Sequence, residues 1–349
     1  MSNVRVKTEK LEKEFLKILK QNGVREDVAD YLIKGIIQAS LRGMDSHGIR
    51  LFPHYLEGFK QGRLNKNPNY EFKKTGAATG VLDANHAPGH AAGMEGMKHA
   101  IKLAKSSGVG AVSVSNSSHF GAAAYFALKA AQEDMIGLSF TQATAHVVPY
   151  NGIRPFLGNN PFCLVAPCAH EEPFCLDMAT TTATFNKVQT FAEKNEQLPP
   201  GWALDQHGKE TTNASEVLSL MPIGGYKGFG LSMALEILCS LLTEMEFGPN
   251  VSAMFGNAMN EKRKLGHFFI AINIANFVDP KVFKARLQQM MDNLRKEPND
   301  GLAEVLAAGD KEKNTLLNRK LNGIPIDDVV INGLKDSSLS LKDQLKYEK

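Results

Sequence analysis

The spacing of the apolar residues changes along the chain, and this change restricts the folds that the chain can adopt. Residues 8–20 and 27–42 carry apolar side chains at the spacing of an amphipathic helix. A third helix is expected over 51–59, where the same spacing continues until Gly62. The first 65 residues are therefore predicted to form a helical unit.

Short apolar runs typical of strands then alternate with helical segments. The predicted strands are 81–83, 109–115, 136–141, 162–167, 174–178 and 266–274. The predicted helices are 90–106, 121–132, 231–244, 281–296 and 311–320. Residues 185–215 are polar and contain Pro199-Pro200-Gly201, which predicts a loop excursion. The pattern indicates an α/β fold.

Helices dominate both ends of the chain and strands its middle. We therefore expect residues 1–75 and 280–349 to pack as one helical domain. Residues 76–279 would form a sheet domain inserted between the two halves. The polar tail after about residue 335 is predicted to be disordered.

Composition narrows the class of protein. The 349 residues suggest about two domains, and a net charge of +3 argues against nucleic acid or an anionic membrane as partner. No apolar run approaches the ~18 residues of a membrane span. The N-terminus lacks the apolar core of a secretory leader, and the four cysteines show no Cys-x-x-Cys spacing. These features predict a cytoplasmic protein with free thiols.

Residues 43–50, Gly-Met-Asp-Ser-His-Gly-Ile-Arg, place an acid, a hydroxyl, an imidazole and a guanidinium together. His47 can transfer a proton near neutral pH, Ser46 can orient it, and Arg50 can fork onto a substrate carboxylate. A purely structural role is the alternative, in which the glycine stops one helix and the acid or the hydroxyl caps the next.

Residues 116–121, Asn-Ser-Ser-His-Phe-Gly, follow a predicted strand and precede a predicted helix. Strand ends carry chemistry on a rigid scaffold. His119 could be a second acid or base, or it could orient another group. The alternative is a histidine that merely caps the turn.

Residues 224–230, Gly-Gly-Tyr-Lys-Gly-Phe-Gly, open a predicted apolar helix. Backbone N–H groups at a helix start bind anions, and Lys227 adds a full charge. The stretch is not a Walker loop, and no Rossmann fingerprint occurs, since Gly108-Val109-Gly110 lacks the third glycine. A phosphate-bearing cofactor outside the common dinucleotide fold is compatible with this pattern.

A metal site is not predicted. His86 and His90 lie near Asp83, but Pro88 and Gly89 separate the two histidines, so they do not share a helix face.

Several motifs together resemble the malate/L-lactate dehydrogenase family over about residues 8–330. They are Asp45-Ser46-His47-Gly48, Asn116 to Gly121, Gly158-Asn159-Asn160-Pro161, Asp177-Met178-Ala179-Thr180, Gly225 to Gly230, Gly266-His267-Phe268-Phe269 and Gly323-Ile324-Pro325. The resemblance implies a nicotinamide-dependent reductase of 2-keto acids. It also implies a homodimer and a non-Rossmann cofactor domain built on a mixed or antiparallel sheet.

The resemblance also implies roles for single residues. His47 and His119 match the histidines that handle substrate and proton, with Ser46 beside the first. We expect His119 to transfer the proton and His47 to donate a hydrogen bond to the carbonyl or the carboxylate. The positions that match cofactor-binding residues are Thr141, Asp177, Met178, Ala179, Lys227 and Gly228.

The carboxylate-binding arginine departs from the family pattern. Many members place it four residues after the Ser-His-Gly histidine, where this chain has Leu51 and Arg50 stands one residue earlier. Ile49 and Leu51 are expected to face the core, which leaves Arg50 to face the substrate. Arg154, in the following Asn-Gly-Ile-Arg loop, is the alternative.

Together these features predict an NAD(P)-dependent enzyme that interconverts a 2-hydroxy acid and its 2-keto acid. Malate and oxaloacetate are the favoured pair, and NAD is favoured over NADP. Ureidoglycolate or another 2-hydroxy acid, or a cyclic imine, are alternative substrates. An inactive nucleotide-binding protein is the alternative from another class.

Overall fold

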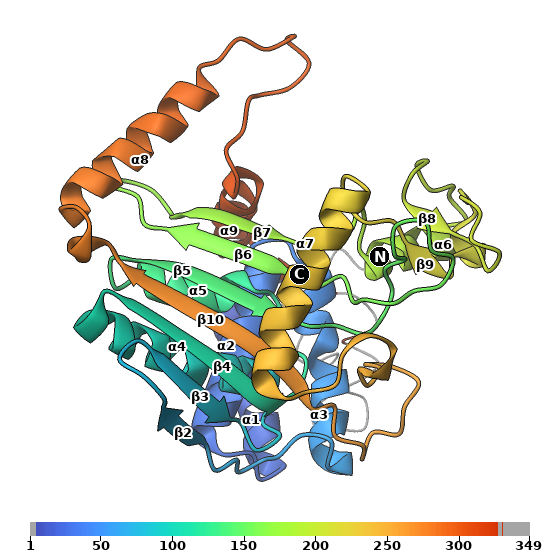
Figure 1. Ribbon diagram of the computed structural model, residues 1–349, viewed down its shortest axis with the longest axis horizontal. Helices are drawn as coiled ribbons and strands as arrows, with labels where there is room; N and C mark the ends of the chain where they lie inside the picture. Colours follow the sequence, from blue (N-terminus) through green and yellow to red (C-terminus); the bar gives the residue numbers. More distant parts are fainter. Residues whose placement is uncertain (1–4, 327–329, 331–349) are drawn as a thin grey trace.

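A central sheet of seven strands organises the computed structural model, which describes residues 5–326 and 330 (Figure 1). The strand order is β2-β3-β4-β10-β5-β6-β7. Strands β3 and β4 run parallel, and all other neighbours in this sheet are antiparallel. The predicted α/β fold with a mixed sheet is thus confirmed. The bounds are β2 Glu71–Lys74, β3 Thr79–Asp83, β4 Val109–Ser117, β5 Met135–Thr141, β6 Phe162–Ala166, β7 Phe174–Met178 and β10 Leu265–Asn273.

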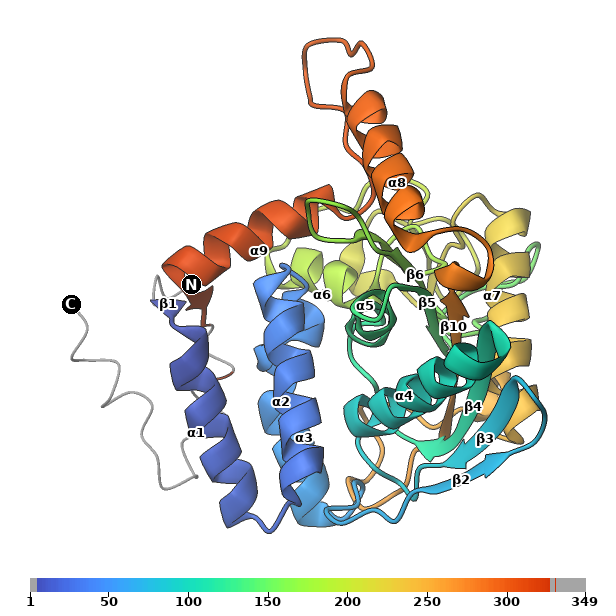
Figure 2. The ribbon, with the colours of Figure 1, turned by 90° about the vertical axis from the view of Figure 1, so that its left-hand side faces the viewer.

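Helices cover both faces of the sheet, with α4 and α5 on one side and α7 on the other (Figure 2). Alternate side chains of β10 lie on opposite faces of the sheet. Phe269 and Ala271 pack under α4 and α5, whereas Phe268 and Ile270 pack against α7. The helices are α1 Thr8–Gln21, α2 Glu26–Leu41, α3 Phe52–Gln61, α4 Gly89–Ser107, α5 Ala124–Ala131, α6 Phe185–Glu193, α7 Tyr226–Cys239, α8 Pro280–Arg295 and α9 Asp310–Asn322.

The N-terminal helices form a further layer outside α4 (Figure 2). Their apolar faces enclose a separate core, in which Phe15 stacks on Phe52 with ring centroids 3.9 Å apart. α2 packs on α4 and on α9, and the short strand β1 (Arg5–Val6) pairs with β11 (Ile324–Pro325). Segments from both ends of the described chain therefore lie together.

The division into a helical domain and a sheet domain stays a prediction, and the polar tail after residue 335 lies outside the described residues. α8 projects away from the rest of the molecule (Figure 2). No helix in the described residues is long and apolar enough to cross a membrane.

The prediction that residues 185–215 form a loop is wrong. This segment contains α6 and β8 (Ala203–Leu204), which pairs with β9 (Ser219–Leu220). Scattered apolar residues of this segment gather into a small core of their own, where Val188 and Leu198 pack with Trp202. Because these residues are far apart in sequence, the periodicity of apolar residues did not indicate this core.

Two helix starts also differ from the prediction. α7 begins at Tyr226 and not at residue 231, because only the first two glycines of the loop have positive φ while Gly228 and Gly230 continue as helix. The helix predicted from residue 51 starts one residue later, because Arg50 and Leu51 lie in a 3₁₀ turn, Ile49–Leu51, and α3 begins at Phe52. Ile49 and Leu51 are buried, as predicted.

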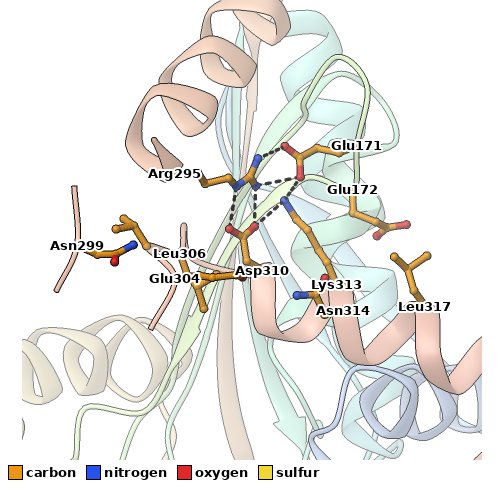
Figure 3. A pocket seen from close by; sticks show the side chains of 11 residues that line it. Glu171, Glu172, Arg295, Asn299, Glu304, Leu306, Asp310, Lys313, Asn314 and Leu317 are labelled. Atoms are coloured by element: carbon orange, nitrogen blue, oxygen red, sulfur yellow. Dashed lines mark hydrogen bonds and ion pairs between the residues drawn. The ribbon is translucent and has the colours of Figure 1, made fainter. Parts of the chain in front are cut away.

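An ion-pair network ties the end of α8 to α9 and to the β6–β7 turn (Figure 3). Arg295 pairs with Glu171 at 2.9 Å and with Asp310 at 2.7 Å, and Lys313 reaches Glu171 at 2.8 Å. These residues line a cavity of about 630 Å³. Burial raises the pKa of Glu171, but hydrogen bonds from Arg295, Lys313 and Gln288 outweigh it and lower the pKa to about 2.

We expect Glu171→Gln to lower the free energy of unfolding by about 1–3 kcal/mol at pH 7, because two cations lose a charged acceptor. The folded pKa of about 2 lies below the ordinary 4.5, so the difference should be complete above pH 4.5 and shrink as the pH falls toward 2. Denaturant unfolding at pH 7 and pH 3 measures both. Glu304 lines the same cavity without an ion pair to any described residue, so Glu304→Gln is the control. Equal effects of the two variants would contradict the assignment.

Candidate active site

The carboxyl end of β4 and the amino end of β10 bring polar residues to one edge of the sheet. Leu265 of β10 pairs with Ser117 of β4. His119 follows β4 and Arg263 precedes β10, so both side chains start from this edge. The register shifts between Leu265 and His267, and such a bulge redirects the side chains next to it.

The N-terminal helical layer supplies the facing side chains. His47 lies in a 3₁₀ turn and Tyr55 on α3. The rings of His47 and His119 stack with centroids 5.6 Å apart. The Tyr55 hydroxyl is 2.7 Å from Nδ1 of His119, and Ser46 Oγ is 2.9 Å from Nδ1 of His47. The two predicted histidines therefore meet, and each uses its Nδ1 for a hydrogen bond to a neighbouring hydroxyl.

Burial lowers the pKa of both histidines. For His119, the neighbouring His47 and the charge of Arg263 add to burial and hold the pKa well below 6.5. For His47, burial is the cause. Both imidazoles are therefore neutral at pH 7, which is the state that a proton acceptor needs.

A third histidine, His90, packs against Tyr55 and against the turn that follows His119. It is fully buried, and its ring meets that of Tyr55 edge-on with centroids 5.2 Å apart. Gly121 lies against this ring with a φ of +76°, and a Cβ there would approach His90 Nε2 to 2.3 Å. Burial lowers the pKa of His90 to about 3, so a neutral ring packs against the turn that carries His119. Sequence reasoning considered His90 only as a metal ligand and missed this position.

Thr141, predicted to lie near the nicotinamide, connects to the same edge through His267. Thr141 Oγ1 is 2.7 Å from His267 Nδ1, and His267 Nε2 is 2.7 Å from Ser117 Oγ. Ser117 stands two residues before His119. This buried chain of hydrogen bonds fixes the end of β5 relative to the turn that carries His119.

The two predicted cofactor segments lie beside each other. Asp177 and Met178 end β7 and Ala179 follows it. The Ile223 N–H donates to the Thr180 carbonyl at 3.0 Å, which brings the glycine-rich loop alongside. Lys227 is exposed on the first turn of α7. A Cβ on Gly228 would lie 1.8 Å from the Ile223 carbonyl oxygen, so only glycine fits there.

These features fit an anionic cofactor group. Around Gly224 and Gly225 a Cβ would meet no atom within 4 Å, so the loop has open space in front of the helix start. The helix dipole and the Lys227 ammonium both favour negative charge at that place. Asp177 has a structural role as well, because its carboxylate accepts from the Ala124 N–H at 2.8 Å. Burial raises the pKa of Asp177 to about 6.

The two arginines proposed as carboxylate clamps lie differently. The Arg50 side chain is 41% exposed and 3.8 Å from Glu193 of α6. Arg154 is exposed on the loop after residue 150. A role of either arginine in binding the substrate carboxylate stays a prediction.

Arg263 was not predicted from the sequence. Its side chain is 5% exposed, and Nη2 donates to Thr144 Oγ1 at 3.1 Å and to the Ser252 carbonyl at 2.6 Å. Burial lowers its pKa to about 9, so the guanidinium stays charged at pH 7. Its neighbours Lys262 and Lys264 make this stretch resemble a solvated charge run, which concealed it. Tyr55 was concealed too, because its spacing is that of a core residue.

Among the described residues, no group of three or more His, Cys, Asp or Glu side chains could hold a metal ion. The cavity of Figure 3 contains none of the site histidines.

Known proteins match this chain over nearly its whole length. The family profile described as malate/L-lactate dehydrogenase matches residues 6–335. The malate dehydrogenase of Pyrococcus abyssi is 34% identical over 346 residues, covering 95% of this chain and 94% of that protein. The L-sulfolactate dehydrogenase of Methanocaldococcus jannaschii is 36% identical and covers 95% of each. The crystal structure of malate dehydrogenase from Entamoeba histolytica superposes with a TM-score of 0.89 at 32% identity, covering 95% of this chain and 96% of that one.

Fold and matches define a dehydrogenase that acts on a CH–OH group. The chain belongs to the malate/L-lactate dehydrogenase family, which confirms the resemblance drawn from its motifs. Membership implies a nicotinamide cofactor.

Proposed function

We propose that this protein interconverts a 2-hydroxy acid and its 2-keto acid with NAD or NADP, that malate and oxaloacetate are its preferred pair, and that NAD is its preferred cofactor. The observation that carries the proposal is His119, neutral and bonded to Tyr55, stacked on His47 at the sheet edge that also carries Thr141. Malate and sulfolactate relatives are similarly close, so the choice of acid rests on the assay below.

The cofactor, when bound, supplies or accepts the hydride. The chain's own residues handle the proton and the substrate oxygen. When the hydroxy acid is oxidised, His119 Nε2 takes the hydroxyl proton while Nδ1–H donates to the Tyr55 oxygen; when the keto acid is reduced, His119 returns the proton. His47, oriented by Ser46, donates a hydrogen bond to the substrate oxygen.

Cofactor binding in this proposal falls to Lys227 and the N–H groups around Gly228, with Asp177, Met178 and Ala179 alongside and Thr141 near the nicotinamide. An exposed lysine at a helix start with open space before it supports the placement of the phosphates.

The decisive test is absorbance at 340 nm with a panel of keto acids and a cyclic imine, using both reduced cofactors.

His119→Ala should lower kcat by roughly 10²–10⁴, the usual contribution of a general acid or base. His47→Ala should affect both kcat and KM. Because the pKa of His119 lies well below 6.5, kcat/KM for hydroxy-acid oxidation should stay level down to pH 6.5 before it declines. Near-full turnover in either variant would return that histidine to a structural role. If wild type oxidised neither cofactor with any substrate, an inactive nucleotide-binding protein would be favoured.

Lys227→Ala should weaken binding of the reduced cofactor by about 1–3 kcal/mol, since a charge-assisted hydrogen bond is lost. Fluorescence titration of the reduced cofactor measures it. Lys209 is an exposed lysine outside the cofactor segments, so Lys209→Ala is the control. An unchanged dissociation constant for Lys227→Ala would remove this lysine from the cofactor site.

We also propose a homodimer that covers the outer face of α7. Met233 and Ile237 on α7, and Leu241 in the 3₁₀ turn that follows it (Leu241–Thr243), stand four residues apart and are 54%, 44% and 55% exposed. Single exposed apolar residues are ordinary, but such a stripe indicates an interface. Light scattering at micromolar concentration should give twice the chain mass, and Ile237→Glu should reduce it to one chain mass. Leu321 is 73% exposed on α9, so Leu321→Glu should leave the mass unchanged. A monomeric wild type would contradict the proposal.

A further inference from the structure

We propose that Arg263 binds the substrate carboxylate, the one attached to the reacting carbon. This inference rests on the proposed function and assigns the carboxylate clamp to a residue other than Arg50 or Arg154. It defines the substrate class as acids whose carboxylate is directly bonded to the carbon that exchanges hydride.

The charge of Arg263 is uncompensated within the described chain. Arg263 is 5% exposed, and no carboxylate of the described residues forms an ion pair with it. Its partners are neutral oxygens, from the Thr144 hydroxyl and the Ser252 carbonyl. A buried cation without a counter-ion is costly, and proteins keep one where a ligand supplies the opposite charge.

Arg263 also stands at the end of the sheet that carries His119. It stands two residues before the start of β10, and β10 begins where Leu265 pairs with Ser117, two residues before His119. Thr144, bonded to Arg263, follows β5, whose Thr141 pairs with His267. The guanidinium therefore stands at the edge that holds the proton-transferring histidine. A carboxylate held there would place the adjoining carbon next to His119.

The Arg263 guanidinium is preorganised by its neighbours. Nε and Nη2 of Arg263 are fixed by Ser252 and Thr144, which leaves the two N–H donors of Nη1 without a hydrogen bond to any described residue. The loop that precedes it is held by Arg63, 2% exposed, whose guanidinium donates to the backbone carbonyls of Glu261, Met254, Asn257 and Ala258.

The other arginines are worse placed. The N–H donors of Arg63 are hydrogen-bonded to the four backbone carbonyls. Arg50 is 41% exposed beside Glu193, whose charge already opposes its own. Arg154 is exposed on its loop. A solvated arginine discriminates less between an acid and its neutral analogue than a buried one does, because water competes for its donors.

The test uses oxamate, an unreactive mimic of a 2-keto acid, titrated calorimetrically into the full-length protein saturated with reduced cofactor. Arg263→Gln should weaken oxamate binding about 10²-fold or more, as expected when one partner of a buried charge pair is removed. Arg263→Lys keeps the charge without the planar donors and should show a smaller loss. Lys264, the exposed neighbour, provides the matched control, and Lys264→Gln should bind oxamate as wild type does.

Affinity for the reduced cofactor, measured alone, should be equal in all four proteins, which shows that the variants fold. In the keto-acid assay, Arg263→Gln should raise KM at least as strongly as it weakens oxamate binding. Oxamate binding by Arg263→Gln equal to that of wild type overturns the inference. So does a loss of oxamate binding in Arg50→Lys or Arg154→Lys while Arg263→Lys keeps it. A wild type that binds oxamate through Arg263 but turns over no keto acid would contradict the proposed function alone.

Discussion

The antiparallel pairing of β10 with β4 and β5 is the constraint on which the site depends. It sets Leu265 opposite Ser117 and His267 opposite Thr141, and the bulge between the two β10 residues turns the strand where it meets the site. Side chains from three strands thereby converge at one edge. A slip of one residue would move every side chain of β10 to the opposite face, so Phe269 would leave the core under α4.

The site is electrostatically unusual because its imidazoles are neutral and its guanidinium is charged. Burial keeps His47, His90 and His119 unprotonated at neutral pH, and Arg263 reinforces this for His119. His119 as proton acceptor and Arg263 as anion receptor therefore stand together without neutralising each other. A carboxylate side chain facing His119 would instead neutralise the charge of the guanidinium. The helical layer contributes the two groups that complete this arrangement, His47 and Tyr55.

Much of this could be predicted from the sequence, because the signals were local. Periodicity located most strands and helices to within a few residues, and the position of His119 after a strand indicated chemistry. The burial of Ile49 and Leu51 followed from their alternation around Arg50. The features that the sequence did not reveal depend on contacts between residues far apart in the chain. Tyr55 has core spacing and gains a polar partner only because α3 packs against the turn after β4. Arg263 lies between two lysines and becomes buried only when Arg63, two hundred residues earlier, holds the preceding loop.

The pairing of β1 with β11 bears on the order in which the molecule can assemble. Arg5 lies opposite Pro325, and α2 packs on α9 as well as on α4. Contacts at such sequence separation form late, since loop closure must precede them. During synthesis the first helices emerge long before their C-terminal partners, and with their apolar faces incompletely covered they are exposed to misassociation. The helices that carry His47 and Tyr55 can thus reach their final packing only after residue 325 has left the ribosome, and catalytic competence is acquired as one of the last events of biogenesis.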